Sequence, residues 1–172
     1  MFLTEEEILG TSAALKLTCD YFGQNAEMID AFFAANTQRK FTVMGCGSSY
    51  MLSKSAAAVL ASFPETAANA IPAGDYIADH AFWQDTVRGS IVLMLSRSGR
   101  TSEMVWAARK IKQSLGCPII SINAEADNDI TPMSDLELSM PWCHDNSVCQ
   151  TRTVTNLYAA ALLLACLLYT SD

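Results

Sequence analysis

Short apolar runs alternate along the chain with longer stretches in which apolar residues recur at helical spacing. The short runs predict strands over residues 41–44, 67–71, 91–95, 118–122 and 136–140. The helical spacing predicts helices over 49–63, 101–115 and 148 to the chain end, and a helical turn over 75–80. An N-terminal helical arm is expected to start with Thr4 as its N-cap and to break near Gly23, giving one or two helices.

Strands that alternate with helices are typical of βαβ units and a parallel sheet covered on both faces. The sequence therefore predicts an α/β fold, an open three-layer α/β/α sandwich of flavodoxin-like type. Ligands of such sheets bind beyond the carboxyl ends of the strands, where the winding direction reverses. Two turns rich in small residues, Gly45–Ser49 and Ser96–Thr101, are expected at those ends and can face one crevice.

The turn Ser96-Arg97-Ser98-Gly99-Arg100-Thr101 combines three hydroxyl side chains with a glycine, between a buried strand and a helix. A helix N-terminus presents unpaired backbone N–H groups and the positive end of the helix dipole. The hydroxyls add neutral donors, and the glycine allows a close backbone approach. The pattern predicts a phosphate site. The simpler alternative is that the hydroxyls only cap the helix.

Composition limits the partners that this chain can have. Its 172 residues suit one domain with a real core, and the 51% hydrophobic content disfavours disorder. A net charge of −7 makes nucleic acid or an anionic membrane surface an unsuitable partner. The apolar run Leu157–Tyr169 is shorter than the ~20 residues of a membrane-spanning helix, so a core or interface helix is expected.

The six cysteines form no C-x-x-C pair, and no signal peptide is recognisable, so reduced thiols in a cytoplasmic protein are expected. Cys143, His144 and Cys149 lack a fourth ligand at usable spacing, so no metal site is expected. Cys46 follows a strand where a nucleophile could stand. No His or Asp lies near it in the sequence, which favours a small buried residue.

Three charged residues, Arg100, Glu103 and Glu125, could affect ligand binding. Arg100 either strengthens phosphate binding or points into solvent. Glu103 suits the first turn of its helix and is expected to point away from a bound anion. Glu125 follows a predicted strand and is a candidate for contact with a ligand.

The three tryptophans and His144 are expected in different environments. Trp106 lies on the helical period and is expected to pack in the core, whereas Trp83 and Trp142 are expected on loops at an interface. His144 is interpreted as a solvated loop residue, with an acid–base or ligand role as the alternative.

Three motifs in order, Gly45–Ser49, Ser96–Glu103 and Val148–Thr155, resemble those of the sugar isomerase (SIS) domain family. The resemblance covers Glu7 to Leu164 and is nearest to the first SIS domain of the two-domain type. That type includes the isomerase half of glucosamine-6-phosphate synthase, amino-sugar-phosphate isomerases and deaminases, and fructosamine-6-phosphate deglycases.

The resemblance implies where a phosphosugar is held. Residues that would bind it are Gly47, Ser48, Ser49, Ser96, Arg97, Ser98, Gly99, Thr101, Val148 and Gln150. In this set Ser96, Ser98 and Thr101 would hold the phosphate, and the stretch around Val148 and Gln150 would close over the sugar. Many members of the family have Glu where this chain has Arg100.

The resemblance also implies an activity. The chain would bind a phosphorylated sugar or amino sugar as the N-terminal half of an isomerase, deaminase or deglycase, and form a homodimer through its SIS domain. Aldose–ketose interconversion proceeds by proton transfer through an enediol-like intermediate and needs no metal or organic cofactor. The proton-transfer groups of two-domain members lie in the second half or in a neighbouring subunit, so no catalytic residue is assigned. The alternatives are a regulatory sugar-phosphate sensor and a subunit-interface half with an idle site.

The expected organisation is a helical arm over 1–38, a phosphosugar-binding domain over 39–165 and a separate tail over 166–172. The tail, Cys166–Asp172, resembles the translation of a transposon end used to fragment DNA for sequencing libraries. It is interpreted as read-through, in which case the natural protein continues into a second half. The alternative is a genuine apolar helix end.

Overall fold

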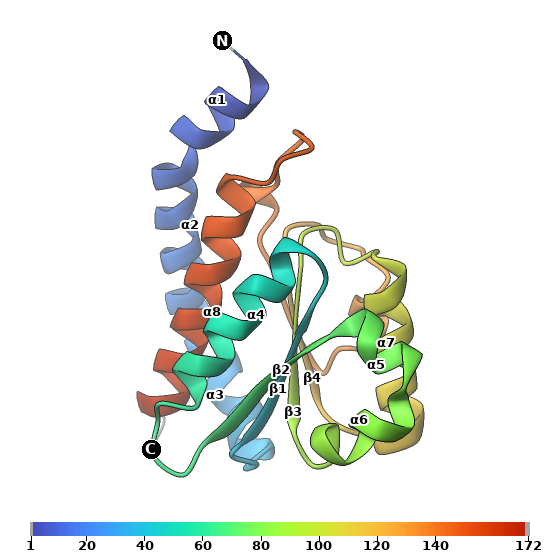
Figure 1. Cartoon of the computed structure of the whole chain (residues 1–172). Coiled ribbons are helices and arrows are strands. Elements are labelled where there is room, and N and C mark those ends of the chain that lie inside the picture. Colours follow the sequence, from blue (N-terminus) through green and yellow to red (C-terminus); the bar gives the residue numbers. More distant parts are fainter. Residues whose placement is uncertain (1, 171–172) are drawn as a thin grey trace.

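A five-stranded parallel sheet lies at the centre of the computed structural model, which describes residues 2–170 (Figure 1). The strands are β1 (Lys40–Gly45), β2 (Ala67–Pro72), β3 (Ile91–Ser96), β4 (Ile119–Asn123) and β5 (Leu136–Ser139), in the order β2-β1-β3-β4-β5. The helices are α1 (Leu3–Leu9), α2 (Thr11–Gln24), α3 (Ala26–Ala35), α4 (Ser48–Leu60), α5 (Ala73–Ala78), α6 (His80–Val87), α7 (Ser102–Leu115) and α8 (Arg152–Thr170). Two short 3₁₀ turns, η1 (Thr131–Met133) and η2 (Pro141–Cys143), flank β5.

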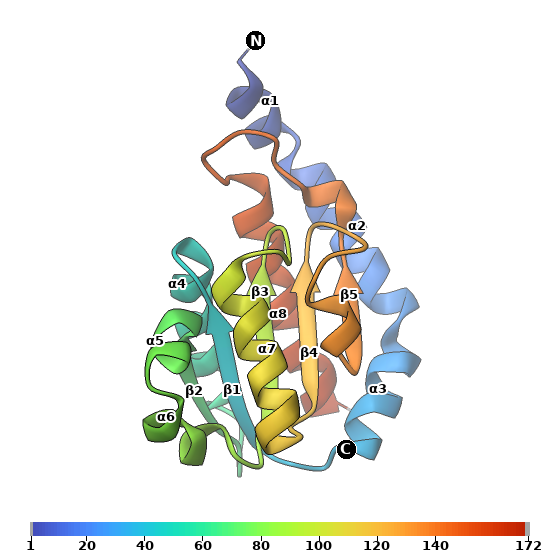
Figure 2. The same ribbon diagram turned by 90° about the vertical axis from the view of Figure 1, so that its right-hand side faces the viewer.

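Helices cover both faces of the sheet, as Figure 2 shows from the side of α7. Helices α2, α3, α4 and α8 bury one face against residues such as Phe41, Leu93 and Ile122. Helices α5, α6 and α7 bury the other face against Met44 and Met94. The expected α/β/α sandwich is therefore confirmed. Every residue of β3 and β4 is buried, which explains why apolar residues dominate both strands.

The register of the strands aligns their carboxyl ends. Met44 of β1 pairs with Met94 of β3, and Ser96 of β3 pairs with Asn123 of β4. After β1 the chain continues into α4 on one face, and after β3 it continues into α7 on the opposite face. The winding direction thus reverses between β1 and β3, which is where α/β sheets bind ligands.

The N-terminal arm differs from its expected boundaries. It contains three helices. A break that was not expected lies at Gly10, and the second break, expected near Gly23, lies at Asn25. Helix α1 starts at Leu3 after Phe2 rather than after Thr4. The second break follows from Asn25, whose side-chain amide donates to the Tyr21 carbonyl at the end of α2.

Two further helix expectations were wrong in extent. Residues 80–87 form α6, because the Asp79 side chain accepts from the Phe82 N–H and caps a new helix. The last helix starts at Arg152 rather than near Val148, because the Asp145 carboxylate accepts from the N–H groups of Thr151 and Thr153.

The tryptophans also differ from expectation. Trp106 is 56% exposed instead of lying in the core. Trp83 lies in α6 rather than on a loop, with its ring edge-on to Phe82. Trp142 lies in the turn η2 and donates its indole N–H to the Thr18 hydroxyl of α2.

Helix α8 is long and apolar enough, by length and composition alone, to cross a membrane. It nevertheless packs against α2, α3 and α4, with residues such as Leu157, Leu164 and Leu168 almost completely buried. These contacts are those of a core helix, as expected.

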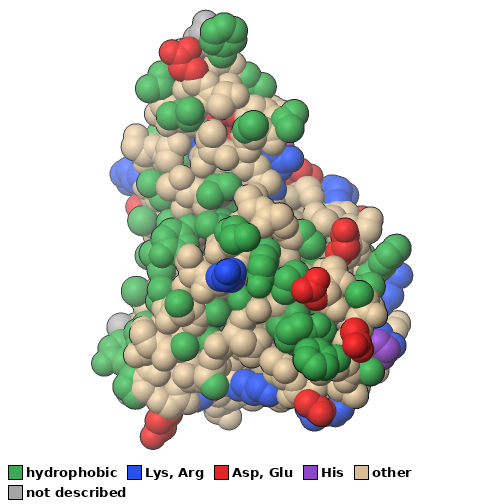
Figure 3. Space-filling view, viewed as in Figure 1, with side chains coloured by type: hydrophobic (Ala, Val, Ile, Leu, Met, Phe, Trp, Pro, Cys, Tyr) green, Lys and Arg blue, Asp and Glu red, His purple; other side chains and the backbone are tan. Residues whose placement is uncertain are grey.

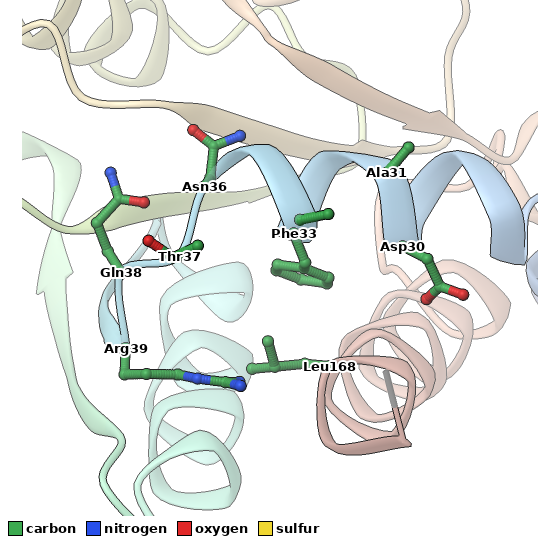
Figure 4. A pocket seen from close by; sticks show the side chains of 9 residues that line it. Asp30, Ala31, Phe33, Asn36, Thr37, Gln38, Arg39 and Leu168 are labelled. Carbon is green, nitrogen blue, oxygen red and sulfur yellow. The ribbon is translucent and has the colours of Figure 1, made fainter. Parts of the chain in front are cut away.

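Leu168 belongs to the tail for which read-through is predicted, and it lines a pocket of about 410 Å³ with Phe33 and Arg39 (Figure 4). The helix continues through residue 170. Residues 171 and 172 of that tail lie outside the described residues, and its origin stays a prediction.

Gly45 should be sensitive to substitution, because its strand end lies against the first turn of α4. A Cβ there would lie 2.6 Å from the Ser49 carbonyl carbon. Gly45→Ala is expected to lower the free energy of unfolding by about 1–3 kcal/mol, measured by urea titration. The control is Gly23→Ala, where a Cβ meets no atom within 4 Å and a helical alanine is expected to stabilise by up to about 1 kcal/mol. Equal midpoints for the two variants would contradict the close approach of α4 to Gly45.

Candidate functional site

A small cavity of about 90 Å³ lies at the carboxyl edge of the sheet, between the loops that follow β1 and β3. Its lining residues come from three segments that are distant in the sequence. They are Cys46, Ser49, Leu95, Ser96, Arg97, Ser98, Thr101, Met104 and Gln150. The structure therefore brings together both small-residue turns and one residue of the segment before α8.

The serine hydroxyls of the turn after β3 are set up to donate hydrogen bonds. Ser96 Oγ accepts from the Gly99 N–H at 3.0 Å, and Ser98 Oγ accepts from the Arg100 N–H at 3.2 Å. Neither hydroxyl proton has an acceptor among residues 2–170, nor have those of Ser49 and Thr101. Four O–H donors without partners thus line one cavity, which suits a ligand rich in acceptor oxygens.

Two helices begin at this cavity without a side-chain cap. Thr101 is the N-cap of α7 and Gly47 is the N-cap of α4, and neither makes a capping hydrogen bond through its side chain. The positive dipole ends of two helices of 13 and 14 residues therefore converge here, although the N–H groups of Ser49 and Tyr50 in α4 already donate to backbone carbonyls. The arrangement favours an anion.

Arg97 supplies a full positive charge to the cavity wall. Its Nη1 donates to the Ser147 carbonyl at 3.0 Å. Within residues 2–170 its other guanidinium nitrogens make no hydrogen bond and it forms no ion pair. Arg97 therefore remains available to a bound anion.

Arg100 is exposed, as one of its two expectations had it, but its guanidinium also contacts the loop after β4. Its guanidinium pairs with Glu125 at 3.4 Å and with Asp129 at 3.6 Å, and donates to the Asp127 carbonyl at 3.0 Å. Arg100 thus binds the acidic loop after β4 and does not line the cavity. Glu125 is occupied by this contact, and its other oxygen lies 3.5 Å from Nδ1 of His144.

Gly99 is required for a reason that the sequence did not suggest. Its φ is +62°, and a Cβ would lie 2.2 Å from the Asn128 side chain. The glycine lets the turn pack against Asn128, whose amide bonds hold the loop after β4. It is not among the residues that line the cavity.

Three other predicted residues also lie outside the cavity lining. Gly47 and Ser48 are exposed, and Val148 is 93% exposed. Gln150 does line the cavity, and its buried Oε1 has no hydrogen-bond partner in the described part of the chain. Ligand contact by these residues stays a prediction.

Cys46, Leu95 and Met104 also line the cavity and were not predicted to do so. All three lie in or next to the segments that the motifs had indicated. Burial raises the pKa of the Cys46 thiol, and the nearby Glu103 carboxylate raises it further. A protonated thiol is a poor nucleophile, so the structure supports a packing role. Among residues 2–170 no group of three His, Cys, Asp or Glu side chains could hold a metal ion.

Glu7 of α1 was also missed, and no sequence signal pointed to it. Its buried carboxylate accepts from the N–H groups of Asn146 and Ser147, at 2.7 and 3.1 Å, and from the Ser147 hydroxyl. The Ser147 hydroxyl bond holds the pKa of Glu7 below its ordinary value, and the backbone bonds and the Arg152 charge act in the same direction. Asp145 holds the far end of the segment before α8, because its carboxylate accepts from the N–H groups of Thr151 and Thr153.

The chain belongs to the SIS domain family, whose model matches residues 36–167. The sequence-based resemblance is thereby confirmed. No curated protein sequence matches the chain. Solved structures do match it.

Tagatose-6-phosphate ketose/aldose isomerase from Escherichia coli superposes with a TM-score of 0.84 at 20% identity, over 95% of this chain and 47% of that one. The C-terminal domain of glucosamine-fructose-6-phosphate aminotransferase from Francisella tularensis gives 0.76 at 17%, over 98% and 49%. The Vibrio vulnificus NanR protein complexed with ManNAc-6P gives 0.69 at 15%, over 98% and 61%. These likenesses establish a shared fold, and the chain spans about half the length of the first two proteins.

The raised pKa of Cys46 predicts slow alkylation. Iodoacetamide at neutral pH is expected to modify Cys46 more slowly than the exposed Cys19 and Cys149, as followed by peptide mass spectrometry. Glu103→Gln removes the neighbouring charge and should increase the rate at Cys46. Fastest modification at Cys46 in the unmodified protein would contradict the proposed packing role.

The lowered pKa of Glu7 predicts a loss of stability in acid. A carboxyl whose pKa is lowered by folding contributes stability that is complete above its unfolded pKa and is lost as pH falls through its folded pKa. The stability difference between the wild type and Glu7→Gln should therefore be largest near neutral pH and shrink below the ordinary glutamate range. Urea unfolding across this range measures it, and a difference independent of pH would contradict the assignment.

Proposed function

We propose that the cavity binds the phosphate group of a sugar phosphate. The observation that carries this proposal is a set of available donors around one small cavity. They are four hydroxyl protons without acceptors, the unused N–H groups of the Arg97 guanidinium, and the positive ends of two helices. The cavity is small, about 90 Å³, which suits a phosphate group better than a whole hexose. The sugar itself would lie at the open side, near Gln150.

We further propose that the chain is the N-terminal half of an amino-sugar-phosphate isomerase, deaminase or deglycase of the cytoplasm. Family membership and the isomerases among its structural relatives support this interpretation. This half would anchor the phosphate, so that binding energy places the reacting carbons for proton transfer. The base that removes the proton next to the carbonyl would come from another part of the assembly, and no metal or organic cofactor is invoked.

A regulatory sugar-phosphate sensor is the second candidate. It is favoured by one observation, the likeness of fold to the NanR protein, which is complexed with ManNAc-6P. Both candidates use the same phosphate site. Only the first requires turnover of the ligand.

A homodimer is proposed through the face built by α2, α4 and α8. Figure 3 shows hydrophobic side chains spread over this face. Large apolar residues exposed on its helices include Leu17, Met51 and Tyr169. Exposed apolar patches are typical of interaction surfaces, and a second SIS domain or a second copy would cover them.

The phosphate site is tested by Ser96→Ala combined with Ser98→Ala. Each hydrogen bond to a charged group contributes about 1.5–3 kcal/mol. Loss of two such bonds is expected to lower the affinity for glucosamine 6-phosphate about a hundredfold or more, measured by titration calorimetry. The control Ser114→Ala removes an exposed hydroxyl from the far end of α7 and should leave the affinity unchanged. Unchanged affinity in the double variant, or equal binding of glucosamine without phosphate, would refute the site.

A further inference from the structure

Helix α1 lies against the rest of the molecule through a single buried side chain. Figures 1 and 2 both place it beyond the sheet, beside the loop that precedes α8. Its apolar residues Leu3, Ile8 and Leu9 are about half exposed or more, whereas Glu7 is 2% exposed. A glutamate as the one buried residue of a helix is the reverse of the usual pattern and calls for a specific partner.

That partner is Ser147, which is 140 residues away in the sequence and 9% exposed. Glu7 accepts hydrogen bonds from the backbone N–H and from the hydroxyl of Ser147. The carbonyl of the same residue accepts the Arg97 bond at 3.0 Å. Ser147 thus connects a buried carboxylate to the guanidinium of Arg97, a residue that lines the cavity.

We propose that Glu7 is a positioning residue for the phosphate site, which fixes Ser147 so that Arg97 is held with its unused N–H groups at the cavity. The inference rests on the proposed function, because it concerns the affinity of that site. Arginine is long and rich in rotamers, so a binding site that must first order it loses affinity. Holding it in place beforehand removes part of that cost.

The direction of the effect separates positioning from charge. Glu7 is negative, and through its field alone it would repel a bound phosphate, so neutralising it would tighten binding. If Glu7 acts by holding Ser147, neutralising it loosens Arg97 and weakens binding. The two mechanisms predict opposite signs.

The experiment measures binding of glucosamine 6-phosphate, and of inorganic phosphate as a minimal probe, to the full chain by titration calorimetry. Glu7→Gln keeps the size of the side chain and removes the charge. It is expected to weaken both ligands roughly three- to tenfold, the range that ordering one long side chain accounts for. The matched control Glu6→Gln makes the same change at an exposed position of the same helix and should have no effect. Ser147→Ala removes only the hydroxyl donor and should cause a smaller loss of the same sign.

A double-mutant cycle tests whether the effect passes through Arg97. In an Arg97→Met background, Glu7→Gln should change the affinity no further, whereas a general loosening of the fold would weaken both backgrounds equally. Where Arg97→Met leaves too little binding to measure, ¹⁵N relaxation of the Arg97 Nε–H group decides. Order in the wild type and mobility in Glu7→Gln support the inference, and equal order overturns it. Thermal unfolding of each variant establishes that it is folded at the assay temperature.

The outcomes distinguish the two proposals. If the wild type binds no sugar phosphate, or the Ser96/Ser98 double variant binds as the wild type does, the proposed function fails. If that double variant loses affinity while Glu7→Gln keeps it, tightens it, or weakens it equally in both Arg97 backgrounds, only the positioning role of Glu7 fails.

Discussion

Strands β1 and β3 lie side by side in the sheet, although α4, β2, α5 and α6 separate them along the chain. Their parallel register places the turns at Cys46 and Arg97 at the same edge. Helix α4 follows β1 on one face of the sheet, and α7 follows β3 on the other face. The N-termini of the two helices therefore lie on either side of the cavity. The cavity, its donors and its positive potential all depend on this pairing. A slip in this register would separate the two turns.

The positive potential of the site is local. The protein carries a net charge of −7, and the second arginine of the turn, Arg100, is neutralised by Glu125 and Asp129. Arg97 forms no such ion pair within residues 2–170. Its partner is the Ser147 carbonyl, which orients the guanidinium without cancelling its charge. Hydroxyls and backbone amides provide the other donors. In the proposed function, a phosphate would be held by one full positive charge together with these neutral donors.

The sheet and much of the cavity could be predicted from the sequence, because local patterns encode them. Buried parallel strands read as apolar runs, and a turn such as Ser96–Thr101 carries its chemistry in consecutive residues. What failed depends on contacts made at a distance. Gly99 is required by Asn128, and the start of α8 is decided by Asp145, seven residues earlier. Glu7 and Ser147 are too far apart in the sequence for any periodicity to relate them.

The residues that line the cavity can hold an anion, but they include no general base. Burial raises the pKa of the Cys46 thiol, which leaves it unsuited to that role. An isomerase built on this half must therefore bring a carboxylate or an imidazole to the open side of the cavity from elsewhere. A sensor needs no such group, but it must change shape when the phosphate binds. The segment before α8 touches the cavity through Gln150 and the N-terminal helix through Ser147. A ligand in the cavity would therefore lie against a segment that the N-terminal helix also contacts.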